Sequence, residues 1–296
     1  MSHTTKDWII ATRPWSFPAS AMPVMVTIAW LWSLPYNINW CFGLWALLNI
    51  IVVHAAGNVW SDIFDFRSGV DANDTYGVRT LVDGQFTVSD FKRLSISLNI
   101  IAVSSGLALV ALTGLTLLWI GLAGILLSFT YPWLKYNALG DLVIILCYAV
   151  LPMLGTSFIV TGSIQPIALW LAPSVGLITV AILHANNVRD IETDTRAGIR
   201  TFPQLTGRRF GVALYCFEVI FPFLWLMGIV VAKIAPWYIL FALLALPIAI
   251  QNARTILSYR KGIAAYARLD EQTAKLQLLF SIILIFGLII GCLCLS

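Results

Sequence analysis

Long apolar runs constrain this chain more than any other feature of its sequence. Each run is close to the ~20 residues that an α-helix needs to cross a lipid bilayer. There are nine, at residues 15–33, 38–58, 94–113, 115–132, 141–161, 166–186, 209–232, 235–251 and 276–295. A mean hydropathy of +0.88, with only 11% charged residues, excludes a water-soluble globular fold. We therefore expect an all-α, polytopic membrane protein with a single domain over residues 1–296.

The charged residues are distributed unevenly along the chain. Lys6 and Arg13 precede the first run. Every other lysine and arginine except Lys233 lies in a connection after an even-numbered run or, for Arg209, at the end of such a connection. The positive-inside rule then predicts a cytoplasmic N-terminus in the inner membrane and, after nine crossings, an external C-terminus. All acidic residues except Glu218 share the basic side, so we expect a polar cytoplasmic cap to be the working face. No nucleic-acid motif is present, and we expect no nucleic-acid partner.

The most informative polar cluster ends the sixth apolar run. Asp190 and Asp194 are four residues apart, so on a helix both carboxylates lie on one face, and Asn186 adds an oxygen one turn earlier. Acids at a helix C-terminus oppose the macrodipole, which makes simple solvated capping unfavourable. Clustered oxygen ligands at this position favour a hard cation such as Mg²⁺ held together with a phosphate.

A second acidic cluster lies far upstream, at the end of the second run. It contains Asp62, Asp65 and Asp71, with Asn58 one helical turn before Asp62. Two registers are open: Asn58 with Asp62 repeats the spacing of the downstream cluster, whereas Asp62 with Asp65 would lead the site from one helix face. Two such clusters on two apolar helices predict one site that holds a diphosphate through Mg²⁺.

Cations and histidines accompany both clusters. Arg79, Lys135 and Arg189 are close to the acids in sequence and are candidates to neutralise diphosphate charge, although inside-positive topology explains any single one equally well. His54 and His184 lie within apolar runs close to the asparagines. They are either satisfied polar residues between helices or groups that orient a ligand or accept a proton.

Five stretches of this sequence resemble the UbiA superfamily of intramembrane prenyltransferases. They are RPWSF at 13–17, HAAGN at 54–58 continuing to DFRSGVD at 65–71, RTLVD at 79–83, KYNALGD at 135–141, and NNVRD at 186–190 continuing to Asp194. The likeness is greatest to the menaquinone branch, which comprises bacterial 1,4-dihydroxy-2-naphthoate prenyltransferases (MenA) and the animal enzyme that makes vitamin K₂. One departure is Ser61, where the branch often has asparagine, so Asn58 and Ser61 both remain candidates to contact the diphosphate.

The resemblance implies nine helices around a central cavity that opens to the bilayer. Its implied Mg²⁺ ligands are Asp62 or Asp65 with Asp71 on one wall, and Asp190 and Asp194 on the other. Its implied diphosphate-binding residues are Asn58, Ser61, Arg79, Lys135, Asn186 and Arg189. The implied reaction is loss of diphosphate from a polyprenyl diphosphate, followed by attack of an aromatic quinol on the allylic cation. For 1,4-dihydroxy-2-naphthoate the ring also loses carbon dioxide.

Other functions remain open at this point. The acceptor of a UbiA-type enzyme could be another phenol, a glycerol phosphate or haem. A membrane phosphatidyltransferase would carry its aspartates in one glycine-spaced motif, which this sequence does not contain. A transporter would bury its acids near mid-span, whereas these acids lie at the ends of the predicted spans.

Overall fold

The computed structural model describes residues 3–69 and 80–295. Within these residues the regular secondary structure is entirely helical, apart from one isolated β-bridge between Asn137 and Arg200. The first half contains α1 Thr5–Ala11, η1 Pro14–Ser16, α2 Pro18–Trp32, α3 Trp40–Arg67, α4 Val88–Thr113, α5 Thr116–Lys135, α6 Gly140–Ile145, η2 Leu146–Val150 and α7 Leu151–Thr161. The second half contains η3 Pro166–Leu171, α8 Ala172–Arg189, α9 Ile191–Arg196, α10 Phe202–Thr206, α11 Arg208–Val231, η4 Trp237–Ala245, α12 Leu246–Leu257, η5 Ser258–Lys261, η6 Ile263–Ala265 and α13 Leu269–Leu295.

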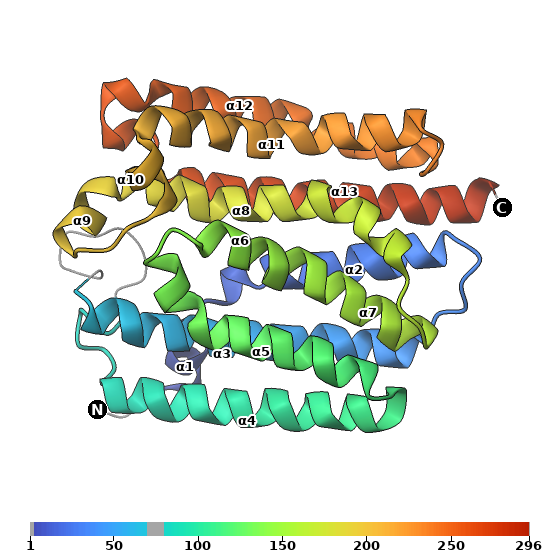
Figure 1. Ribbon diagram of the computed structural model, residues 1–296, viewed down its shortest axis with the longest axis horizontal. Coiled ribbons are helices and arrows are strands. Elements are labelled where there is room, and N and C mark those ends of the chain that lie inside the picture. The colour runs from blue at the N-terminus through green and yellow to red at the C-terminus, as the bar shows by residue number, and fades with distance from the viewer. Residues whose placement is uncertain (1–2, 70–79, 296) are drawn as a thin grey trace.

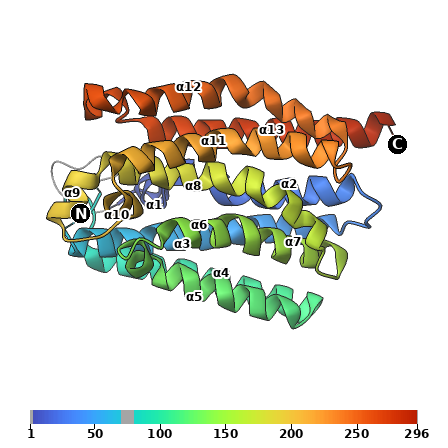
Figure 2. The ribbon, with the colours of Figure 1, turned by 45° about the horizontal axis from the view of Figure 1, so that its top comes forward.

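The long helices run side by side along the longest axis of the molecule (Figure 1). Helices α3, α4 and α5 form one side, α11 and α12 form the other, and α2, α8 and α13 lie between them, as Figure 2 also shows. Eight helical segments of the described residues are long and apolar enough to cross a membrane. The chain is therefore a multi-span membrane protein, and the predicted all-α polytopic fold is confirmed.

The first predicted span differs from the others. Residues 15–33 form the short η1 and the 15-residue α2, which is not among the eight long segments. Two prolines shape it: Pro18 starts α2 at a position where its missing N–H costs nothing, and Pro23 removes an internal hydrogen bond. Because most of α2 is buried against α3, α7 and α13, it is an internal helix of the bundle rather than a lipid-facing one.

One end of the bundle carries the short connecting helices. Helices α9 and α10 and the N-terminus lie at this end, whereas the C-terminus lies at the opposite end (Figure 1). We call this end the polar end, because α3 and α8 deliver Asp65 and Asn186 towards it. Helix α4 starts from the same end with a capping box, in which Thr87 and Asp90 bond each other's backbone N–H groups.

The core and the outer surface are both apolar, as a bilayer protein requires. Trp30, Tyr215, Phe223 and Phe280 are buried between α2, α8, α11 and α13. Large apolar side chains on α4 and α5 face outwards, among them Trp119, which is 70% exposed. Lipid is the solvent that suits such a surface, because it replaces the water that these side chains would otherwise contact.

Candidate active site

Asp65 stands at the last turn of α3 and is held by the loop that follows α5. The hydroxyl of Tyr136 donates a hydrogen bond of 2.6 Å to Asp65 Oδ1, and Lys135 Nζ lies 3.4 Å from Asp65 Oδ2. Asp65 is 7% exposed, so its charge depends on these partners rather than on water. The end of α3 and the end of α5 are thereby joined around one carboxylate.

Asp194, from the second acidic cluster, lies within electrostatic reach of Asp65 and Lys135. Its backbone N–H bonds to the carbonyl of Asp190 at 2.8 Å, which keeps the helical spacing across the break between α8 and α9. Burial raises the pKa of Asp194 to about 7; Lys135 opposes this shift, whereas Asp190 and Asp65 reinforce it by like-charge repulsion. The two acidic clusters are therefore within electrostatic reach of each other, with the ammonium of Lys135 acting on both.

Backbone contacts fix the loops that carry these groups. The N–H of Arg200 bonds to the carbonyl of Tyr136 at 3.1 Å, next to the bridge between Asn137 and Arg200. Ala138 has a φ of +60°, a left-handed conformation that costs a residue with a Cβ about 1–2 kcal/mol. Such strain persists only where surrounding contacts impose it, and here it lets the chain turn from α5 into α6 beside the acids.

The upstream asparagine and histidine are anchored by the N-terminal segment. Asn58 Nδ2 donates to the carbonyl of Thr12 at 3.0 Å and to Ser16 Oγ at 2.9 Å. His54 Nδ1 lies 2.9 Å from Ser20 Oγ, and its Nε2 lies 3.4 Å from Ser16 Oγ. The amide nitrogen of Asn58 is thus committed to the protein, which orients its carbonyl oxygen as the group available to a ligand.

A cavity of about 450 Å³ lies beside these residues. Its polar wall contains five of the sequence-predicted site residues: Asn58, Ser61, Asp65, Lys135 and Asn186. Its remaining walls are mostly apolar and come from α3, α4, α5, η2 and α7. Leu107 of α4 and Leu122 of α5 line the cavity, and both side chains are exposed.

A π-helical turn shapes one of these walls. Residues Leu146–Val150 form it, within the segment that continues from α6 into α7. Single π turns inside α-helices change the direction of side chains and occur often at functional sites. Here the turn directs Cys147 and Tyr148 into the cavity, where the ring of Tyr148 lies edge-on to His54 with centroids 4.9 Å apart.

Four of the described site residues do not line the cavity: Asp62, Arg189, Asp190 and Asp194. Asp62 is 3% exposed, forms an ion pair with Arg13 and does not line the cavity. Arg189 forms two hydrogen bonds of 2.8 Å with Asp190 and lies 3.2 Å from Asp270 on α13. Both registers predicted for the upstream cluster include Asp62, whereas in the structure Asp65 lines the cavity and Asp62 does not.

Two further predicted residues, Asp71 and Arg79, lie outside the described residues.

Several residues near the site were missed by the sequence analysis. Tyr136 holds Asp65, Arg13 neutralises Asp62, and Ser16 and Ser20 bind His54. Tyr136 directly follows Lys135, and its place in the KYNALGD stretch was the only signal available. The contacts of Arg13 join positions about 50 residues apart, and no local pattern indicates them.

Comparison with known proteins identifies the family of this chain. The profile of the UbiA prenyltransferase family matches residues 20–279. This chain belongs to the UbiA prenyltransferase family. UbiA prenyltransferase domain-containing protein 1 of Mus musculus is 32% identical over 295 residues, covering 98% of this chain and 85% of the mouse protein.

Solved structures of the family share this fold. A UbiA homolog from Aeropyrum pernix K1 superposes with a TM-score of 0.67 at 20% identity, covering 93% of this chain and 98% of the homolog. A UbiA homolog from Archaeoglobus fulgidus, bound to GPP and Mg²⁺, superposes with a TM-score of 0.60 at 14% identity, covering 94% of this chain and 99% of the homolog. The family resemblance found in the sequence motifs is confirmed.

Proposed function

We propose that this protein transfers a prenyl group from a polyprenyl diphosphate to an aromatic quinol, and that the acceptor is 1,4-dihydroxy-2-naphthoate in menaquinone biosynthesis. The observation that carries the proposal is Lys135, which pairs with Asp65 at the polar wall of an otherwise apolar cavity and lies within electrostatic reach of Asp194 in the second acidic cluster. A prenyl diphosphate has the same division, with a highly charged head and a hydrocarbon tail.

The polar wall fits a diphosphate held with Mg²⁺. Asp65 at the wall and Asp194 within electrostatic reach of Lys135 supply carboxylates, and the buried carbonyl oxygen of Asn186 has no hydrogen-bond partner among the described residues. Such all-oxygen ligands suit Mg²⁺. The proposed ligands are Asp65, Asp190 and Asp194, with Asp71 retained from the sequence motif. When bound, Mg²⁺ neutralises the charge that develops on the diphosphate leaving group.

The remaining polar residues would bind and orient the diphosphate head. Lys135 is placed to donate to its oxygens, and the carbonyl of Asn58 and the hydroxyl of Ser61 face the same cavity. Arg79 is retained as a diphosphate ligand from the sequence motif alone. Asp62 and Arg189 are assigned supporting roles, because each is paired inside the protein. Preorganised charges of this kind stabilise a departing anion without reorganisation during the reaction.

The apolar part of the cavity would hold the prenyl tail and the reacting carbon. Cleavage of the C1–O bond leaves its electron pair on diphosphate and produces an allylic cation. Tyr148 and Tyr131 line the cavity, and the faces of such rings attract a cation while excluding water. A carbon of the electron-rich quinol ring then forms the new C–C bond, and for the naphthoate the ring loses its carboxylate as carbon dioxide.

The menaquinone acceptor is supported by the motifs of the sequence. The chain carries the branch-like stretches at both acidic clusters, and it resembles UbiA prenyltransferase domain-containing protein 1 of Mus musculus and Homo sapiens over 85% and 84% of their lengths. We further propose that the polar end faces the cytoplasm of the inner membrane. The lysines and arginines gather on that side, and the C-terminus lies at the opposite end of the bundle.

An assay with purified protein in detergent or lipid tests the proposal. Mg²⁺, geranylgeranyl diphosphate and 1,4-dihydroxy-2-naphthoate are combined, and products are read by mass spectrometry. A prenylated, decarboxylated naphthoquinone that disappears with EDTA and in Asp65→Asn supports it. Product with another phenol, glycerol phosphate or haem, but not with the naphthoate, would replace the acceptor and keep the family reaction. Absence of diphosphate release with every acceptor would favour a transporter.

A further inference from the structure

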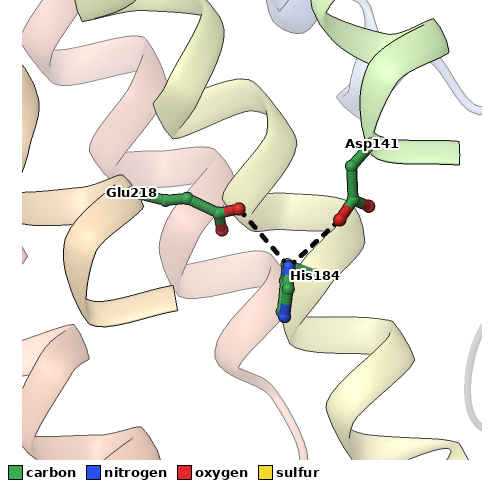
Figure 3. A group of neighbouring side chains, drawn as sticks. All are labelled: Asp141, His184 and Glu218. Atoms are coloured by element: carbon green, nitrogen blue, oxygen red, sulfur yellow. Dashed lines mark ion pairs between the residues drawn. The ribbon is translucent and has the colours of Figure 1, made fainter. Parts of the chain in front are cut away.

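A second polar cluster lies next to the cavity, and the proposed transfer does not use it. It consists of Asp141 at the start of α6, His184 on α8 and Glu218 on α11 (Figure 3). His184 Nδ1 lies 3.4 Å from Asp141 Oδ2 and 3.3 Å from Glu218 Oε1. None of the three side chains lines the cavity, so the cluster is separate from the proposed diphosphate site.

The cluster is buried and incompletely bonded. His184 is 0% exposed and Glu218 is 2% exposed. Among the described residues, neither ring nitrogen of His184 has a hydrogen-bond partner, and Asp141 Oδ1 and Glu218 Oε2 also have none. Buried polar atoms are nearly always satisfied, because leaving one without a partner costs about 1–3 kcal/mol. Of the unsatisfied atoms, His184 Nδ1 is the one that faces the centre of the cluster, where it meets Asp141 Oδ2 and Glu218 Oε1 (Figure 3), and this arrangement points to a ligand between the three side chains.

The charges of the cluster do not balance. Within residues 3–69 and 80–295, the ion pairs of Asp141 and Glu218 are both with the one imidazole. Two ionised carboxylates with a neutral histidine carry a charge of about −2, and without an ion this charge reaches zero only if both the ring and one carboxyl take up a proton. A divalent cation would bring the buried charge to zero and remove the desolvation penalty of two carboxylates.

The geometry is that of ligands around an ion rather than of hydrogen bonds. Both carboxylates approach the same ring nitrogen from different sides, as Figure 3 shows. One N–H shared between two acceptors makes two weakened bonds, and both contacts are longer than the usual hydrogen-bond range of about 2.7–3.2 Å. Ligands at about 2.0–2.1 Å from a tetrahedral ion lie about 3.3–3.4 Å apart, which matches both distances.

We propose that Asp141, His184 and Glu218 bind a divalent transition-metal ion of the zinc type. The three donor atoms lie within 4.8 Å of one another. One imidazole with two carboxylates suits Zn²⁺ or a related ion, whereas Mg²⁺ prefers oxygen ligands alone. Asp141 is the least buried member, with a side chain that is 20% exposed, and it provides the path by which the ion reaches the cluster.

The position of the cluster gives the ion a structural role beside the active site. Asp141 follows Lys135 by six residues, and His184 precedes Asn186 by two. An ion bound here joins α6, α8 and α11, and so fixes the loop of Lys135 relative to the second acidic cluster. We therefore assign it the positioning of these elements, not a contact with substrate.

The experiment measures metal binding directly and uses the full chain in detergent with Asp65→Asn and Asp194→Asn both present. These substitutions disable the diphosphate site, and millimolar Mg²⁺ occupies remaining oxygen sites. After chelator treatment, Zn²⁺ or Co²⁺ is added and the retained metal is measured by mass spectrometry. We expect about one ion per chain, visible Co²⁺ absorption of a four-coordinate site, and loss of both with His184→Ala or Glu218→Gln. The matched control is Glu192→Gln, which removes an exposed acid elsewhere and is expected to retain the ion.

X-ray absorption of the Zn²⁺-loaded protein keeps the test decisive if the cluster variants do not fold. The cluster is intact in this sample, and we expect a shell of one imidazole with oxygen ligands at about 2.0 Å. Absence of retained Zn²⁺ and Co²⁺, an all-oxygen shell, or retention in a folded His184→Ala variant would overturn the proposal. Since no prenyl transfer is measured, these results are independent of the proposed function.

Discussion

The ends of α3 and α8 look alike in sequence but are built differently. Each carries a histidine, then an asparagine, then aspartates. Helix α3 continues unbroken through Asp62 and Asp65, and the N-terminal segment binds its histidine and asparagine. Helix α8 ends at Arg189, before its aspartates, and Asn186 Oδ1 has no hydrogen-bond partner in the part of the chain that the structure describes.

This difference indicates that the two helix ends have different roles within one site. The α3 end is already bonded by protein groups: Arg13 pairs with Asp62, and Lys135 and Tyr136 hold Asp65. The α8 end brings a buried acid, Asp194, whose raised pKa of about 7 shows that its charge lacks full compensation. The α3 end is therefore fixed by protein contacts, whereas the α8 end would gain its missing partners from the metal and the diphosphate.

The largest expected effect separates the two aspartates of the α3 end. Asp65→Asn removes a cavity-lining carboxylate and is expected to lower prenyl transfer by roughly a hundredfold to a thousandfold. Asp62→Asn instead leaves Arg13 without its carboxylate, so it should lower the melting temperature and retain most activity. Steady-state kinetics and thermal unfolding of both variants measure this contrast. Equal loss of activity in two well-folded variants would contradict it.

The next effect concerns the lysine between the two ends. Lys135→Ala is expected to lower kcat by roughly a hundredfold, because one fixed donor to the developing charge is lost. Lys233→Ala is the matched control, since Lys233 lies in the connection between α11 and η4. Turnover at saturating Mg²⁺ provides the measurement. A Lys135→Ala variant with normal kcat would remove Lys135 from the mechanism.

A smaller effect is expected in the pH dependence of the α8 end. Because the folded-state pKa of Asp194 is raised to about 7, Mg²⁺-free protein should lose stability as pH rises through 7. Protons compete with Mg²⁺ for this carboxylate, so the apparent Mg²⁺ affinity should increase about tenfold from pH 6 to pH 8. Melting temperatures with and without Mg²⁺ at both pH values test this. An Asp194→Asn variant with an unchanged pH profile would show that another group is responsible.

The smallest effect concerns the hydrogen bond to Asp65. Tyr136→Phe removes the 2.6 Å bond and leaves Lys135 beside the carboxylate. We expect the Mg²⁺ concentration for half-maximal activity to rise threefold to tenfold, which corresponds to about 1 kcal/mol of Mg²⁺ binding free energy. The effect is small because Lys135 still holds the carboxylate. The Mg²⁺ concentration for half-maximal activity measures it. A loss of prenyl transfer in Tyr136→Phe as large as that in Asp65→Asn would contradict this prediction.

The fold could be predicted from the sequence, whereas the partners of the candidate site residues could not. Span lengths and the positions of the acids follow from local patterns, and these were sufficient to indicate a membrane bundle with one polar end. The choice between Asp62 and Asp65 was not predictable, since both lie towards one side of α3 and only the distant Arg13 separates them. The direction of Arg189 depends likewise on Asp270, 81 positions further along the chain.

The histidines show the same limit. His54 and His184 occupy similar places in sequence, but the serines around one and the carboxylates around the other come from different helices. Local spacing cannot specify such neighbours, because they depend on which helices pack together. The shortness of α2, in contrast, is signalled locally by Pro18 and Pro23.

A double-mutant cycle on prenyl diphosphate binding tests the central claim that both acidic clusters form one site. Mg²⁺-dependent binding is measured calorimetrically for the unaltered chain, Asp65→Asn, Asp194→Asn and the double variant. If the carboxylates share one ligand, the second substitution should weaken binding much less in the variant background than alone. Losses that simply multiply, with no coupling between the two positions, would mean two independent sites and would contradict the account.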